Sequence, residues 1–116
     1  MSSSNRYCGI FFVICACLVG TTRAQDFTVC PARLQDAVKQ IYVFDGTPEE
    51  VIYLAPDDNT TASSLYSVSS IYDRGRFVTV RCKYKGGSII DVQLKSRTIR
   101  CVFRQDKDNY GNLRCR

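Results

Sequence analysis

The chain has 116 residues, a formal net charge of +5 and seven cysteines, and it contains no histidine. The lack of histidine excludes Ser-His and Cys-His nucleophilic sites and imidazole metal ligands. The charge is uneven, because residues 25–70 hold seven acidic and two basic side chains, whereas residues 71–116 hold four acidic and twelve basic ones. A chain of this size forms one domain with a thin core, which covalent cross-links commonly reinforce.

The first 24 residues have the three parts of a secretory signal. Arg6 supplies the positive charge, and residues 8–20 form an apolar run too short to cross a bilayer comfortably. Thr22-Arg23-Ala24 then places small residues at the positions that a signal peptidase requires. We expect cleavage after Ala24, a single mature domain over residues 25–116, and a periplasmic or secreted location.

Three of the seven cysteines lie in the leader, and four lie in the mature part: Cys30, Cys82, Cys101 and Cys115. An even count after an export signal predicts two disulfides formed in an oxidising compartment. No Cys-x-x-Cys pair occurs among these four, so we expect no zinc site. In the leader, Ile14-Cys15-Ala16-Cys17 loosely resembles a lipobox, and lipidation at Cys17 is the alternative to simple cleavage.

The mature chain opens with a predicted helix over residues 31–40. Proline suits the first turn, and apolar residues recur at helical spacing at Leu34, Ala37, Val38 and Ile41. A short strand over residues 41–44 follows, and Asp45-Gly46 ends it as a turn.

Thr47-Pro48-Glu49-Glu50 predicts the start of a second helix. Threonine can cap the helix, proline fits its first position, and the two acids meet the positive end of the helix dipole. We expect Pro56 to end this helix, and its apolar residues to pack on a sheet: Val51, Ile52, Leu54 and Ala55. Residues 57–64 are predicted to form a polar loop, and residues 64–72 a strand rich in hydroxyl side chains.

The last third has the clearest pattern. Polar and apolar residues alternate over residues 78–85, 89–95 and 99–104, and a final strand is predicted over residues 111–115. One face of each strand is therefore buried, which is typical of antiparallel strands in a meander. The predicted fold is mainly β, a small single antiparallel sheet with one or two short helices and two disulfides.

A meander also implies a register. A three-residue loop over residues 86–88 places Cys82 opposite Val92, and a two-residue loop at Ser96-Arg97 places Val92 opposite Cys101. Cys82 and Cys101 then lie two strands apart, roughly 9 to 10 Å. A disulfide needs Cα atoms within about 7 Å, so this pair should not bond.

The five-residue loop over residues 106–110 places Cys101 directly opposite Cys115. We therefore predict a Cys101–Cys115 disulfide and, by elimination, a Cys30–Cys82 disulfide. Four cysteines allow three connectivities, and the sequence leaves the other two open.

In this register the outward side chains form a basic sheet face. One row contains Arg81, Gln93, Arg100 and Arg116, and a second contains Lys83, Asp91, Val102 and Arg114. The candidate binding residues, for an anion or an acidic protein, are Arg81, Lys83, Lys85, Arg100, Arg104 and Arg114. The competing interpretation is a solvated face that protects the sheet edge.

Catalytic and cofactor sites are not predicted. Glu49-Glu50 and Asp57-Asp58 are explained by the helix dipole and by loop solvation. Gly86-Gly87 suits a hairpin turn rather than a phosphate-binding loop. The tyrosines are scattered rather than grouped for base stacking, so nucleic acid is not an expected partner. We expect a non-enzymatic protein without a metal or cofactor.

Several short motifs occur in order along the mature chain: Cys30-Pro31, residues 43–50, Leu54-Ala55-Pro56-Asp57, residues 80–84, Arg100-Cys101-Val102 and a final cysteine. With these motifs the chain resembles an uncharacterised family of small exported proteobacterial proteins. The resemblance implies a periplasmic location without an assigned activity. The occurrence of some members near secretion-system genes implies an immunity or accessory role.

The expected function is a periplasmic binding or inhibitor-type module that acts on a protein partner, either a resident or an incoming one. A disulfide-stapled β scaffold with a polarised charge suits docking onto a protein. The alternative is an envelope-associated structural protein whose basic sheet face binds anionic lipid or cell-wall polymer.

Overall fold

The computed structural model describes residues 25–108 and 110–116, and the predicted signal sequence with its lipidation alternative lies outside the described residues. Within that part the chain forms eight β-strands, the α-helix α2 (Ser69–Asp73) and the 3₁₀ helix η2 (Pro48–Glu50). The predicted mainly-β class with two disulfides is confirmed.

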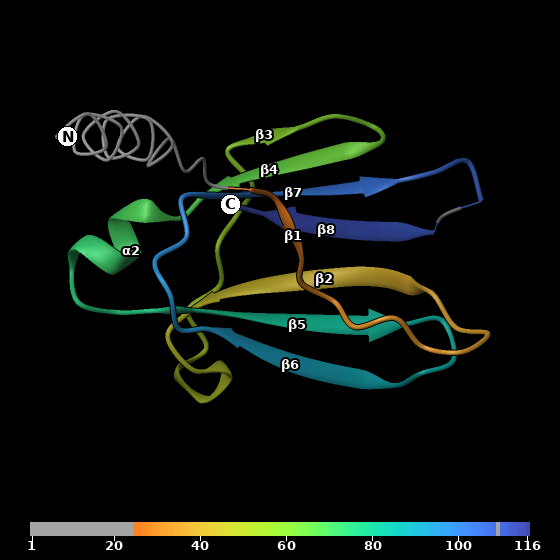
Figure 1. Cartoon of the computed structure of the whole chain (residues 1–116), viewed down its shortest axis with the longest axis horizontal. Coiled ribbons are helices and arrows are strands. Elements are labelled where there is room, and N and C mark those ends of the chain that lie inside the picture. The colour runs from red at the N-terminus through yellow and green to blue at the C-terminus, as the bar shows by residue number, and fades with distance from the viewer. Residues whose placement is uncertain (1–24, 109) are drawn as a thin grey trace, which may run out of the picture.

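The strands form one continuous antiparallel sheet in the order β3-β4-β7-β8-β2-β5-β6, with β1 added to β8 (Figure 1). Their bounds are β1 Phe27–Thr28, β2 Val38–Asp45, β3 Asp58–Asn59, β4 Ser63–Ser67, β5 Val78–Tyr84, β6 Ile89–Leu94, β7 Arg100–Gln105 and β8 Gly111–Cys115.

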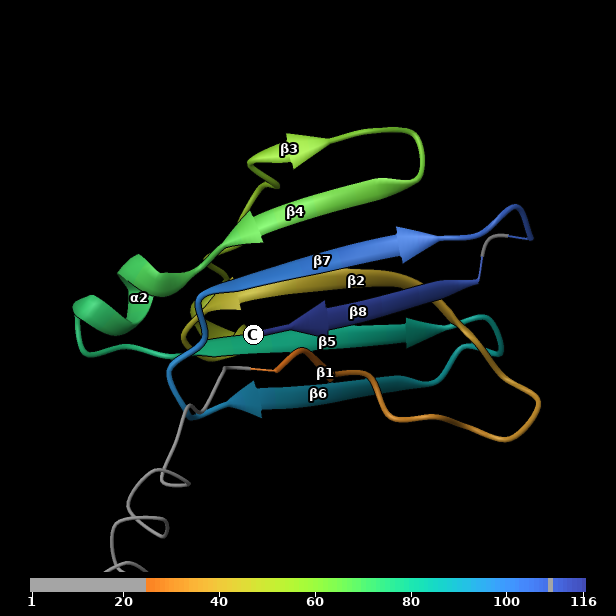
Figure 2. The same ribbon diagram turned by 45° about the horizontal axis from the view of Figure 1, so that its top comes forward.

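The sheet folds over itself at the β8–β2 junction. These two strands are paired only at Val38 and Gly111, and the two halves of the sheet overlie one another when the molecule is turned (Figure 2). We call β3, β4, β7, β8 and β1 the arginine half, and β2, β5 and β6 the tyrosine half.

The core lies between the inner faces of the two halves. In β5 the alternate residues Val78, Val80 and Cys82 are all fully buried, and they pack in one cluster with Cys101 and Leu113 from the arginine half. Full burial of a valine or leucine side chain stabilises the fold by about 1.5–3 kcal/mol. The period-2 pattern of the sequence therefore identified the buried face correctly.

Cys101 lies directly opposite Cys115, as the hairpin register predicted, and the two form a disulfide with a Cα–Cα distance of 4.0 Å. Both cysteines are buried. Together with the second disulfide, this bond indicates folding in an oxidising compartment.

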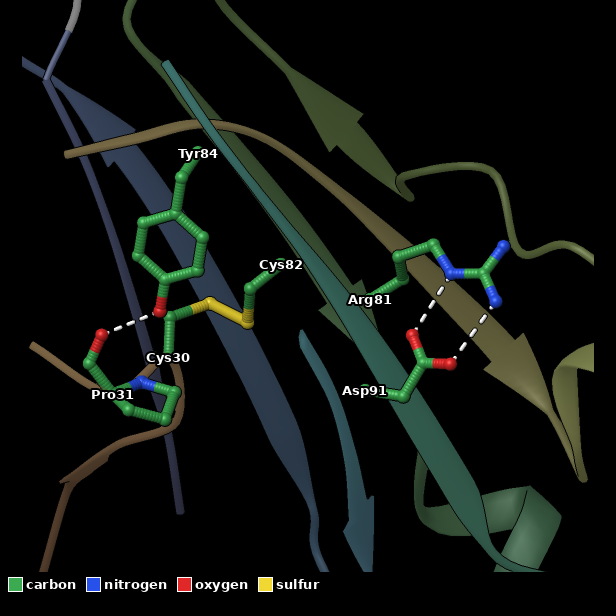
Figure 3. Close-up of a disulfide and its surroundings, with 6 residues drawn as sticks. All are labelled: Cys30, Pro31, Arg81, Cys82, Tyr84 and Asp91. Carbon is green, nitrogen blue, oxygen red and sulfur yellow. Dashed lines mark hydrogen bonds and ion pairs between the residues drawn. A yellow bond between two sulfur atoms is a disulfide. The ribbon is translucent and has the colours of Figure 1, made fainter. Parts of the chain in front are cut away.

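The second disulfide joins Cys30 to Cys82 with a Cα–Cα distance of 5.8 Å, as predicted by elimination (Figure 3). It attaches the segment after β1 to the middle of the tyrosine half. Next to it, the Tyr84 hydroxyl donates a hydrogen bond to the carbonyl of Pro31. Burial raises the pKa of Tyr84, which keeps this hydroxyl protonated as a donor.

The predicted meander is wrong at one junction. Among the described strands β6 pairs with β5 alone, whereas β7 lies between β4 and β8. The chain crosses between the halves through residues 95–99, where Thr98 is buried and Ile99, predicted to face the core, is half exposed. Alternation specifies which face of a strand is buried and not which strand lies beside it.

The β5–β6 hairpin also differs in register. Cys82 lies opposite Ile90 rather than Val92, because the loop begins one residue earlier than predicted. The amide of Tyr84 donates to the carbonyl of Ser88 at 2.9 Å and closes that loop. A shift of two positions leaves every side chain on its predicted face.

The predicted helix over residues 31–40 does not form. The segment is irregular until β2 begins at Val38, and Leu34, expected to be buried, is 93% exposed. The Asp36 carboxylate instead accepts a hydrogen bond from the amide of Gly86 at 3.0 Å. Helical spacing was misleading because Val38 and Ile41 are buried as part of β2, and tertiary contacts outweigh weak propensity.

The second predicted helix starts where expected but lasts a single turn. The Glu50 carboxylate accepts a hydrogen bond from the amide of Thr47 at 2.8 Å, as a capping box requires. Val51 then adopts a left-handed conformation with φ 58° and ends the turn well before Pro56. The next residues form backbone hydrogen bonds to the edge of β2, so Val51, Ile52 and Ala55 remain exposed and Leu54 alone packs on the core.

Two further predictions need correction. The predicted polar loop over residues 57–64 contains β3, which pairs with β4 in a hairpin. The predicted strand over residues 64–72 ends at Ser67, and α2 begins at Ser69. Val68 directly before α2 and Ile71 within it are buried, so only the first part of this stretch continues as a strand.

The two disulfides should differ in their contribution to stability. In the chain-entropy model, a closed loop of 14 residues contributes about 3 kcal/mol and one of 52 residues about 4 kcal/mol. Urea denaturation of a Cys30→Ala/Cys82→Ala variant should therefore show a larger loss of unfolding free energy than a Cys101→Ala/Cys115→Ala variant. A larger loss for the Cys101→Ala/Cys115→Ala variant would show that loop-closure entropy does not determine the contribution of these disulfides, and that native-state strain or residual structure in the unfolded chain does.

Gly111 should not tolerate a side chain. A Cβ at this position would lie 2.3 Å from the Phe103 ring and 3.0 Å from the Val38 carbonyl oxygen, at the residue where the two halves join. We expect Gly111→Ala to lower the unfolding free energy by about 1–3 kcal/mol through overpacking. In thermal unfolding, the neighbouring exposed substitution Asn112→Ala should have little effect.

Candidate functional site

The six candidate residues do not share one face. Arg100 and Arg104 on β7, and Arg114 on β8, lie on the outer face of the arginine half. Arg81 and Lys83 lie on β5 in the tyrosine half, and Lys85 follows in the β5–β6 loop. The predicted rows combined residues of both halves because they assumed that β6 lies beside β7.

The three arginines of the arginine half line a groove with a volume of about 570 Å³. Its middle is apolar, because Leu65 of β4 lies opposite Val102 of β7, and both side chains are half-buried. Val102 in turn lies opposite Arg114. We call this surface the arginine groove, and its main residues are Leu65, Arg100, Val102, Arg104, Arg114 and Arg116.

Strand register fixes the spacing of the charges. Arg100 lies beside Arg116, since their backbones exchange hydrogen bonds at 3.0 and 3.1 Å. Arg104 lies on the same strand as Arg100, four residues further on, which is about 13 Å along an extended strand. The groove therefore has guanidinium groups at both ends and an apolar floor between them.

The four arginines of this groove form no ion pair within the described part of the chain. Asp26 and Asp58 are the acidic residues of its lining, and each lies on a peripheral strand or segment. The lining therefore has four arginines against two aspartates, and the groove carries a net positive potential.

Four other arginines of the described part have acidic partners: Arg74, Arg76, Arg81 and Arg97. Arg81 binds Asp91 through two hydrogen bonds of 2.8 and 3.0 Å across the β5–β6 pair (Figure 3). This pairing lowers the pKa of Asp91 and raises that of Arg81. Arg97 likewise lies 2.7 Å from Asp73. These guanidinium groups are engaged within the molecule.

The most connected ion pairs lie at the turn after β2. The carboxylate of Asp45, which is 8% exposed, accepts hydrogen bonds from Arg74 at 3.0 Å and from Arg76 at 2.6 Å. Arg76 also donates to Glu50 at 2.7 Å. That hydrogen bond is the main cause of the lowered pKa of Glu50, with the Thr47 amide adding to it. The network holds the β2 turn against the segment after α2, and we assign it a structural role.

The lysines predicted as binding residues stack on aromatic rings. The Lys83 ammonium lies 5.4 Å from the centroid of Tyr42, and the Lys85 ammonium lies 3.9 Å from that of Tyr110. Lys85 also donates to the carbonyl of Asp108 at 2.9 Å. Such contacts hold a cation in place within the molecule.

Among residues 25–108 and 110–116, no three side chains of His, Cys, Asp or Glu gather closely enough to hold a metal ion. No helix of the described part is long and apolar enough to cross a bilayer.

Sequence reasoning missed part of the groove. Arg116 was placed in a predicted row with Arg100, correctly, but was not chosen as a binding residue. Leu65 had no signal in the sequence, because its place beside Val102 depends on the pairing of β4 with β7, which are distant in the chain. Only the tertiary structure brings these residues together.

No family model matches the chain, and no match is found among curated proteins or solved structures. Function is therefore inferred from the chemistry of the groove.

The ion pairs predict a pH dependence of stability. Glu50 and Asp91 have pKa values below their ordinary ones in the folded protein, so each binds a proton more weakly when folded. Their contribution is present above the ordinary carboxyl pKa and is lost as the pH falls through the lowered one. In urea denaturation, Glu50→Gln should flatten the decline of unfolding free energy below about pH 5.

Glu49→Gln is the matched control, since Glu49 lies in the same turn and forms no ion pair in the described part of the chain. It should leave the pH dependence close to that of the wild type. If unfolding free energy falls with pH equally in both variants and the wild type, the Arg76–Glu50 pair does not contribute to the pH dependence of stability.

Proposed function

We propose that this protein is an exported, non-enzymatic binding module that docks an acidic segment of another protein in the arginine groove. The observation that carries this proposal is the distribution of charge pairing. Arg81 and Arg97 have carboxylate partners, whereas Arg100, Arg104 and Arg114 have none in the described part. The rigid sheet fixes the backbone positions of these arginines, and their guanidinium groups are available to accept carboxylates.

The spacing favours an extended peptide. Side chains four residues apart in an extended chain lie about 13 Å apart, the same separation as Arg100 and Arg104. A segment with acidic residues at these two positions and an apolar residue midway would place carboxylates at both ends of the groove. Its apolar side chain would cover Val102 and Leu65, whose half-buried surfaces lie between the charges. The expected ligand pattern is therefore acidic-x-apolar-x-acidic.

The disulfides support an oxidising compartment, and the predicted signal sequence favours the periplasm or the extracellular space. There, a rigid basic groove suits an inhibitor or immunity role, because electrostatic complementarity accelerates association and selects acidic partners. An anionic lipid or cell-wall polymer is the competing ligand, and it would use the same arginines without needing the apolar floor.

Charge reversal separates the groove from the rest of the basic surface. We expect Arg104→Glu to weaken binding of a synthetic Glu-Ser-Leu-Ser-Glu peptide by about tenfold, since the contact between this side chain and one glutamate of the peptide becomes repulsive. Lys83→Glu makes the same charge change on the tyrosine half and should leave the affinity within about twofold. NMR titration at fixed ionic strength measures both affinities and reports whether each variant is folded.

A permuted peptide with adjacent glutamates and vesicles containing phosphatidylglycerol complete the experiment. Weaker binding of the permuted peptide supports recognition of spacing. Vesicle binding without peptide binding, or equal losses from both charge reversals, would overturn the protein-docking proposal, and the vesicle result would favour the envelope role.

A further inference from the structure

Among residues 25–108 and 110–116, no strand pairs with the outer edge of β6. The other long edges are covered: β1 pairs with β8, and residues 52–54 bond to the edge of β2, with the Leu54 amide donating to the Val43 carbonyl at 2.8 Å. β3 is an edge strand of two residues and carries Asp58, which is a usual protection against strand addition. β6 has six residues, and neither a proline nor a lysine interrupts them (Figure 1).

The hairpin register shows which backbone groups face that edge. The Tyr84 amide bonds to the Ser88 carbonyl, and hydrogen-bonded pairs alternate along an antiparallel ladder. Ile90, Val92 and Leu94 therefore bond to β5, whereas Ile89, Asp91 and Gln93 direct their N–H and C=O groups outward. These groups have no backbone partner in the described part of the chain.

The side chains at this edge are incompletely covered. Ile90 and Val92 point toward the core and pack against it but remain half-buried, whereas Val80 on the adjacent strand is fully buried. On the outer face Ile89 is 53% exposed. A further strand beside β6 would cover both sets of apolar side chains.

We propose that the occupant of this edge is a second copy of the same chain, with the two β6 strands paired antiparallel about a two-fold axis at Val92. The outward-facing groups allow this register, which places Asp91 opposite Gln93 of the second copy and Ile89 opposite the second copy's Lys95. On the core side, Ile90 lies opposite Leu94 of the second copy, so apolar residues meet apolar residues.

The pairing of Asp91 with Arg81 permits a self-association of this kind. The carboxylate of Asp91 is the only acidic charge of β6 and is already held by Arg81, so two copies approach without strong repulsion. A register shifted by one side-chain pair would place Asp91 opposite its own counterpart, which is destabilising. The register centred on Val92 avoids this contact. It also places the outward N–H and C=O groups of one β6 strand opposite the C=O and N–H groups of the other.

The pairing would have a consequence for the arginine groove. The two-fold axis would be perpendicular to the extended sheet, so both arginine halves would lie on the same side of it. Two grooves would then face one surface, and a partner with repeated acidic segments would bind with avidity. The dimer itself does not depend on the proposed ligand of the groove.

Gln93→Pro tests the pairing, with Gln93→Ala as its matched control. The Gln93 amide points away from β5, so proline removes a donor from the edge without breaking the internal ladder. Sedimentation velocity over a concentration series should show a dimer for the wild type and for Gln93→Ala, and a monomer for Gln93→Pro. Far-ultraviolet circular dichroism and thermal unfolding confirm that each variant is folded.

A second pair of variants tests the register, and it also tests the pairing itself if Gln93→Pro does not fold. Ile89→Lys would meet the second copy's Lys95 and should weaken the dimer, whereas Ile89→Glu should strengthen it. A monomeric wild type, a folded Gln93→Pro dimer, or equal effects of the two Ile89 variants would overturn the proposal. Arg104→Glu should remain dimeric, so failure of groove binding and failure of dimerisation are distinguishable.

Discussion

The pairing of β7 between β4 and β8 determines most of what this protein presents to its surroundings. It brings Cys101 against Cys115, so the two central strands are covalently joined at the core face. On the opposite face, the same pairing sets Val102 between Leu65 and Arg114. Because successive side chains of a strand alternate between faces, one ladder produces both a buried disulfide and an exposed groove.

The ion pairs divide the basic side chains into two groups. Some stabilise the fold, and others are available to bind a ligand. Arg76 and Arg81 complete ion pairs that hold turns and neighbouring strands together. Arg100, Arg104 and Arg114 extend from a sheet whose disulfide and ladder fix their spacing, and they form no ion pair in the described part of the chain. Such a surface selects its ligand by the positions of its charges. Its backbone is already ordered by folding, whereas a flexible basic segment would lose conformational entropy on binding.

Much of the fold was predictable from the alternation of residues. The buried positions of β5, the Cys101–Cys115 pair and the mainly-β class follow from a period of two, since burial selects one face of each strand. Helical spacing around Leu34 failed, because a local pattern cannot show that Val38 and Ile41 will be buried in a strand while Leu34 remains exposed. The candidate site was predicted in part: Arg100, Arg104 and Arg114 share a face, but the remaining predicted residues lie on the other half.

The sequence by itself determined the mainly-β class, the buried face of β5 and where positive charge is concentrated along the chain, and it favoured the disulfide connectivity that forms. These properties depend on strand periodicity, on short hairpin loops and on composition, all of which are local. The tertiary structure alone decided which strands are neighbours, and with them the groove and the open edge of β6. Neighbouring strands are chosen by the packing of two sheet halves around one core, and that choice joins Leu65 to Val102 across residues far apart in the chain.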